Sequence, residues 1–177
     1  MPTSHSLAAS PGGSPLSFGG MRLDPSSAID LELVLANARR LQHAIDPLQR
    51  QALLRGKNLA LMCEASESAD ATRFSEAALR LGAHVAYLRT GFADLRIDDV
   101  RRHTARMLGR LYQGIECQGL PADLVAELAR EAGIPVYDGV ATATHPFARL
   151  AQSLDDRCSL EENRQLVVQA VLVSSIA

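Results

Sequence analysis

Side chains that could do chemistry follow three short apolar runs of this 177-residue sequence. They are Cys63, Glu64, Cys117, Gln118, Asp138 and His145. A cysteine beside a histidine could act as a nucleophile, and two cysteines with a histidine are ligands that zinc accepts. Neither pattern shows a third orienting group or the spacing of a metal motif. We therefore predict no metal site and no cofactor, and we assign no catalytic residue.

The elements that must position these side chains are predicted by hydrophobic patterning. The apolar runs 59–63, 84–88, 114–117 and 135–138 are typical of buried parallel strands. Segments with helical character separate them, at 66–81, 98–111 and 121–132. This alternation predicts an α/β fold: a single three-layer domain with a four-stranded parallel sheet flanked by helices. The carboxyl ends of such strands meet at one edge, where ligands bind.

The two ends of the chain differ from this repeating pattern. Residues 1–22 are rich in Ser, Pro, Gly and Ala, and we predict a disordered tail followed by one domain over 23–177. An amphipathic helix is expected from Ile29 to His43. Ser159 and Glu162 form a capping box that opens a last helix over 159–176. Because no strand precedes this helix, we expect it to pack across the domain.

Composition excludes several classes of protein. The net charge is −2, aromatic residues make up 4% and tryptophan is absent, which argues against a nucleic-acid-binding protein. The sequence contains no apolar run of about 18 residues, so we predict no membrane span. Three cysteines without paired spacing favour a cytoplasmic location.

Several motifs resemble those of the ornithine/aspartate carbamoyltransferase family. They are GKNLALM at 56–62, LGAHV at 81–85, HTARMLGRLYQGIE at 103–116, IPVYDG at 134–139 and His145-Pro146. The resemblance covers about 24–154 and implies the N-terminal, carbamoyl-phosphate-binding domain. The segment from Glu162 to Ser174 is similar to the final helix of the family, which returns from the second domain to pack on the first. The resemblance thus implies a first domain joined to that helix, with the amino-acid-binding domain missing.

The ligand motifs of the family are altered in this sequence. A Ser-Thr-Arg-Thr stretch, an Arg in a Glu-x-Arg-Gly context and a His-Pro-x-Gln motif hold carbamoyl phosphate in the family. The corresponding positions are Glu67, Ser68, Ala69 and Asp70, then Gln118, then His145 and Ala148. The loss of the arginines and the gain of two carboxylates disfavour binding of an anionic phosphate. We expect Glu67 and Asp70 to satisfy the helix N-terminus themselves, leaving a vestigial site.

Two functional hypotheses follow from these residues. In the first, the chain is a non-catalytic carbamoyltransferase-like protein that acts as an oligomeric scaffold or a partner of a full-length carbamoyltransferase, with a homotrimer implied by the resemblance. In the second, a pocket lined by Cys63, Glu64, Arg73, Cys117 and His145 serves a repurposed small enzyme or a protein that binds amines or amino acids. For Arg73 a solvated helix face is the favoured interpretation. His145 either caps a helix or remains from a ligand site.

Overall fold

Four parallel strands form the centre of the molecule. The computed structural model describes residues 23–43, 46–89 and 98–176. The strands are β1 (Asn58–Met62), β2 (His84–Leu88), β3 (Gly114–Cys117) and β4 (Val136–Asp138). Their order in the sheet is β2-β1-β3-β4, and every pair is parallel. The predicted four-stranded α/β fold is confirmed.

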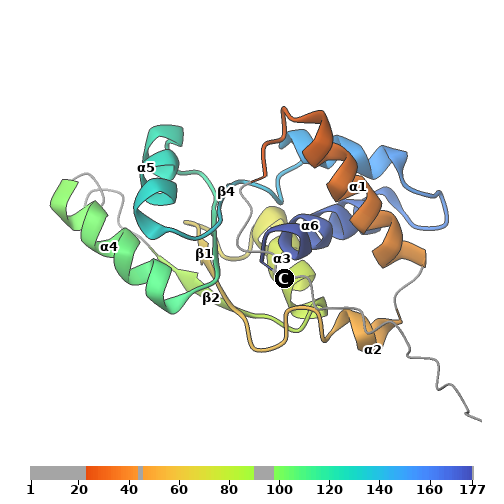
Figure 1. The fold of residues 1–177 in the computed structure, drawn as a ribbon, viewed down its shortest axis with the longest axis horizontal. Helices are drawn as coiled ribbons and strands as arrows, with labels where there is room; N and C mark the ends of the chain where they lie inside the picture. The colour runs from red at the N-terminus through yellow and green to blue at the C-terminus, as the bar shows by residue number, and fades with distance from the viewer. Residues whose placement is uncertain (1–22, 44–45, 90–97, 177) are drawn as a thin grey trace, which may run out of the picture.

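Helices cover both faces of this sheet, as Figure 1 shows. α4 (Asp98–Leu111) and α5 (Ala122–Ala132) lie on one face, where they pack on Ala60 and Met62. α1 (Ala28–His43), α3 (Ala69–Arg80) and α6 (Leu160–Ile176) lie on the other, over Leu59 and Leu61. Successive side chains of a strand point to opposite faces, so β1 supplies both halves of the core. The short helix α2 (Pro47–Arg50) precedes β1.

The last helix packs across the domain, as predicted. α6 lies against α1, α3 and the 3₁₀ helix η2 (Pro146–Ser153), with Val167, Ala170 and Val171 almost fully buried. Its capping box forms: the Ser159 N–H donates to Glu162 Oε2 at 2.7 Å, and the Glu162 N–H donates to Ser159 Oγ at 3.2 Å. Burying each large apolar side chain of this helix stabilises the fold by about 1.5–3 kcal/mol. α6 is thus part of the core of this domain.

Two further points concern the sequence predictions. The 3₁₀ helix η2 begins at Pro146, directly after His145, for which the sequence offered helix capping as one of two roles. The predicted disordered tail, 1–22, lies outside the described residues. Within the described part of the chain, no helix is both long and apolar enough to cross a membrane.

Candidate functional site

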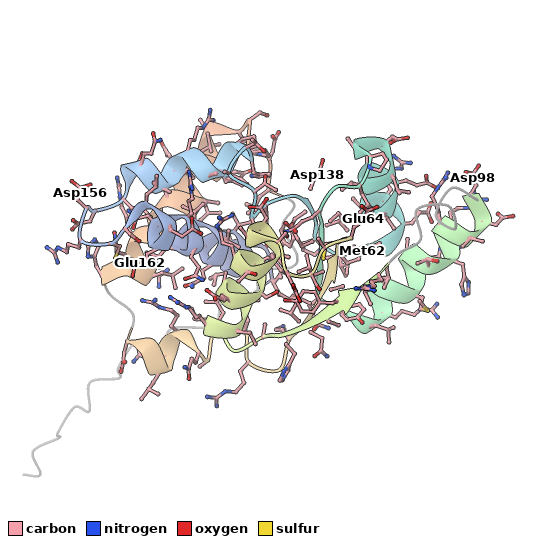
Figure 2. The ribbon with its side chains drawn as sticks, turned by 180° about the vertical axis from the view of Figure 1, so that it is seen from behind. Met62, Glu64, Asp98, Asp138, Asp156 and Glu162 are labelled. Atoms are coloured by element: carbon pink, nitrogen blue, oxygen red, sulfur yellow. The ribbon has the colours of Figure 1, made fainter. Side chains whose placement is uncertain are left out.

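The candidate site lies at the carboxyl ends of the strands. Met62 ends β1 and is followed by Cys63 and Glu64, and Asp138 ends β4. Figure 2 labels Met62, Glu64 and Asp138 in this region. The segment between β1 and α3, the residues after β3 and the loop from Gly139 to His145 therefore approach the same edge.

The N-terminus of α3 is capped by the chain itself. Ser68 is the N-cap residue, and its Oγ accepts a hydrogen bond from the Ala71 N–H at 3.1 Å. Ala69 is the first residue of the helix, and Glu67 is exposed. Of the two acids expected to satisfy this N-terminus, Asp70 lies in the first turn of α3 and Glu67 precedes the N-cap residue, but neither accepts the capping hydrogen bond. The hydroxyl of Ser68 does so, and Asp70 turns to a cation on the next turn of its own helix.

That cation is Arg73, which is 8% exposed. Its Nε donates to Glu161 Oε1 at 2.5 Å, and its guanidinium donates to Asp70 Oδ1 at 2.7 Å and to the Ala141 carbonyl. Burial alone would lower the pKa of Arg73, but the hydrogen bonds to Glu161 and Asp70 raise it. The favoured interpretation of Arg73 as a solvated residue is wrong, because Glu161 and Ala141 reach it from α6 and from the loop after β4.

The carboxyl end of β3 carries a fully buried acid. Glu116 Oε2 accepts a hydrogen bond from the Val140 N–H at 3.1 Å, and Oε1 accepts one from the Gln118 amide at 3.2 Å. Burial raises the pKa of Glu116 to about 8, which these hydrogen bonds partly oppose. Gln118, expected from the resemblance to replace an arginine, donates a hydrogen bond to this neighbouring carboxyl.

His145 begins η2. Its Nδ1 accepts a hydrogen bond from the Phe147 N–H at 3.2 Å, so it caps this helix. Burial lowers the pKa of His145, although the charge of Asp138 acts in the opposite direction. Of the two interpretations left open, the structure shows the capping contact. Ala148, one turn later, is half-buried and offers no polar side-chain atom.

The two cysteines lie on opposite sides of the sheet. Cys63 packs in the core formed with α3 and α6, whereas Cys117 packs in the core formed with α4 and α5. Burial raises the pKa of both thiols, which opposes formation of a thiolate. Among the described residues, no three His, Cys, Asp or Glu side chains come close enough together to hold a metal ion.

The five residues proposed for one pocket are therefore distributed over separate places. Cys63 and Glu64 line a hollow beside β2, Arg73 lines another between α3 and α6, and His145 lines a third beside β4. Cys117 is fully buried. Sequence reasoning missed Glu116, although its place in a continuous apolar run marked it as buried.

The known proteins that are similar to this chain are carbamoyltransferases. A family described as "Aspartate/ornithine carbamoyltransferase, carbamoyl-P binding domain" matches residues 21–162. Ornithine carbamoyltransferase of Cutibacterium acnes is 37% identical over 131 residues, which are 74% of this chain and 39% of that protein. A catabolic ornithine carbamoyltransferase of Haemophilus influenzae is 35% identical over 125 residues, or 71% of this chain and 37% of that protein.

Solved structures give the same picture. Ornithine carbamoyltransferase from Pyrococcus furiosus has a TM-score of 0.63 and 25% identity, over 78% of this chain and 45% of that one. The enzyme from Thermus thermophilus has a TM-score of 0.57 and 28% identity, over 77% and 44%. The chain thus spans less than half the length of the proteins it matches.

Proposed function

Because this chain belongs to the aspartate/ornithine carbamoyltransferase family through its carbamoyl-phosphate-binding domain, we propose that it is a member that no longer binds carbamoyl phosphate or transfers its carbamoyl group. The observation that carries this proposal is the state of the α3 N-terminus. Ser68 caps it, Ala69 replaces the phosphate-binding arginine implied by the resemblance, and the nearby Arg73 is already held by Asp70, Glu161 and Ala141.

Charge supports the same conclusion. An unpaired carboxylate within about 4 Å repels a phosphate by roughly 4 kcal/mol per unit charge at an effective dielectric constant near 20, and the ion pair of Asp70 with Arg73 reduces this figure without turning it into an attraction. A charge-assisted hydrogen bond from an arginine contributes about 1.5–3 kcal/mol, and Ala69 supplies none. A site that loses the arginine and gains a carboxylate therefore has no useful affinity for a doubly charged phosphate.

The other two ligand positions support the proposal independently. The Gln118 side chain carries no charge and donates to Glu116. His145 keeps its residue type, but its Nδ1 is occupied by the Phe147 N–H, and Ala148 replaces an amide side chain. Each of the three motifs that the resemblance assigns to carbamoyl phosphate thus lacks a charged or polar group that the family motif contains.

We further propose that α6 corresponds to the returning helix of the family. Its burial against α1, α3 and η2 supports a single folded unit over 23–177. The role we assign to this unit is that of an oligomeric scaffold, or a partner subunit of a full-length carbamoyltransferase, in the cytoplasm.

A restored variant tests the loss of the ligand site. Glu67→Ser, Ala69→Arg, Asp70→Thr and Gln118→Arg together return the charge pattern that the resemblance implies at these four positions, and each raises the net charge by one. A control with Glu32→Ser, Ala36→Arg, Gln152→Arg and Asp156→Thr changes the net charge by the same amount at exposed positions outside α3 and its N-terminal cap. Calorimetric titration with carbamoyl phosphate should detect binding to the restored variant only. Equal binding by the parent chain, or an equal gain in the control, contradicts the proposal.

A further inference from the structure

A cavity of about 430 Å³ lies along the outer edge of β4. β4 is the last strand of the sheet, so this edge has no neighbouring strand among the described residues. The cavity is bounded by α5, β4, the start of η2, α6 and the residues that precede α1. It is separate from the N-terminus of α3, none of whose residues lines it. Its size lies within the range of small-molecule sites.

The walls of this cavity are apolar. Val125 and Ala129 come from α5, Val136 from β4, Phe147 from η2 and Val171 from α6. Phe147 and Val171 are buried, so the floor belongs to the rigid core. Such walls favour the hydrocarbon body of a ligand, because transferring it from water stabilises the complex by about 25 cal/mol per Å² of apolar surface.

Three polar side chains, Tyr137, Asp138 and His145, break this apolar lining, and the Tyr137 hydroxyl is already bonded to Ser175. Asp138 is exposed at the end of β4 and supplies a carboxylate. The Nδ1 of His145 accepts the Phe147 N–H, so a neutral ring carries its proton on Nε2. None of the described residues that line the cavity is Lys or Arg. Asp138 is therefore the charged group that a ligand meets here.

We propose that the cavity along β4 binds an amphipathic organic cation, a primary amine with an aryl or alkyl body. The body lies against Val125, Ala129 and Val171, and the ammonium group pairs with the Asp138 carboxylate. An anionic ligand of the same shape meets repulsion from Asp138, and an uncharged one gains no ion pair with this carboxylate. The cavity shares His145 with the vestigial phosphate site, but the groups that hold the amine, Asp138 and the apolar residues of α5, are outside that site.

Three probes with one body and different head groups test the charge preference. They are 3-phenylpropylamine, 3-phenylpropan-1-ol and 3-phenylpropanoate, each titrated into the full chain at pH 7.5 and followed by calorimetry. We expect the amine to bind with a Kd below about 1 mM, roughly ten-fold tighter than the alcohol, and the acid to bind weakest. Equal affinities, or no binding of the amine at 10 times that concentration (about 10 mM), overturn the proposal.

Two variants locate the site. Asp138→Asn should weaken the amine to the level of the alcohol and leave the alcohol unchanged. Asp123→Asn, on the exposed first turn of α5 and outside the cavity lining, is the matched control and should change nothing. Ala129→Trp should fill the cavity and abolish binding of all three probes. Since the chain has no other tryptophan, a blue-shifted emission then reports that the indole is buried in a folded protein. An amine preference that survives Asp138→Asn, or probe binding by an Ala129→Trp variant whose indole is buried, contradicts this assignment.

Discussion

At the scale of single residues, the loop between β4 and η2 is fixed from two sides. Glu116 accepts the N–H groups of Val140 and Ala141 from the side of β3, at 3.1 and 3.4 Å. Arg73 donates to the Ala141 carbonyl from the side of α3. Both side chains are buried, so neither contact is screened by water to the extent of a surface pair. This loop leads to His145, so the position of His145 depends on the buried Glu116 carboxyl and the buried Arg73 guanidinium.

The pKa of Glu116 gives a prediction about pH. Burial raises it to about 8 from an ordinary value of 4.5. Between these two values the unfolded chain releases the proton while the folded chain keeps it, so this residue makes the fold less stable as pH rises. Glu116→Gln removes the titration but keeps the shape. Its free energy of unfolding, relative to the parent, should increase from pH 5 to pH 8 in urea denaturation.

The control for this experiment is Glu32→Gln on the exposed side of α1. It should follow the parent at every pH. If Glu116→Gln also follows the parent at a constant offset, Glu116 is ionised throughout this range and the assignment of its pKa is wrong.

At the scale of elements, local sequence signals predicted the bounds of helices and strands, whereas contacts between residues far apart in the chain were not predicted. The sequence placed a helix at 98–111 and a strand at 114–117, and α4 and β3 have these bounds. The capping box of Ser159 and Glu162 is a local signal and was confirmed. The partner of Arg73 is 88 residues away on α6, and no local pattern reports such a contact.

The sequence also did not predict on which side of the sheet a residue lies. Cys63 follows β1 and Cys117 ends β3, so both were expected at one edge. The pleat directs their side chains to opposite faces of the sheet. Only the register of β1 with β3 shows which face each side chain takes. The proposed loss of the ligand residues, in contrast, rests on the resemblance and on counting along the chain, which places Ala69 where the family has an arginine.

The packing of α4 on α5 gives a prediction for one glycine. A Cβ atom added at Gly109 would lie 2.0 Å from the carbonyl oxygen of Ala132, the last residue of α5. Gly109→Ala ordinarily stabilises a helix by about 0.5–1 kcal/mol. Here it should destabilise the protein by about 1–2 kcal/mol, because overpacking forces the two helices apart.

Thermal unfolding followed by circular dichroism measures this effect. The midpoint should fall by about 2–8 °C for a chain of this size. His103→Ala, at an exposed position of the same helix, is the control and should leave the midpoint within about 2 °C of the parent. A higher midpoint for Gly109→Ala contradicts the close approach of α4 and α5.

At the scale of the whole molecule, one side of the sheet is covered more completely than the other. α1, α3, α6 and η2 bury one face together, whereas α4 and α5 form a thinner layer. This thinner half exposes large apolar side chains, among them Met107 at 46% and Leu111 at 54%. The two are four residues apart on α4 and so share one face of the helix. An apolar pair at this spacing suits an interface with another subunit.

The oligomeric role proposed above therefore makes a prediction. Light scattering after gel filtration should give a mass of three times 19.0 kDa, the mass of one chain. Met107→Glu with Leu111→Glu should shift the mass towards one chain, because two buried charges without partners oppose association. Ile29→Glu with Leu48→Glu, two exposed apolar positions on the far helices, should not. A parent chain that runs as a monomer at micromolar concentration, and that does not bind a full-length carbamoyltransferase, contradicts this role.

The loss of the carbamoyl phosphate site is tested most directly by titrating the parent chain with carbamoyl phosphate in a calorimeter, with inorganic phosphate as the control ligand. The capped α3 N-terminus, Ala69 and the Asp70 carboxylate predict no binding heat at millimolar concentrations of either ligand. A Kd for carbamoyl phosphate below about 100 μM corresponds to a binding free energy of roughly −5.5 kcal/mol. Binding this tight would contradict the account and indicate that the ligand site of the family is still present.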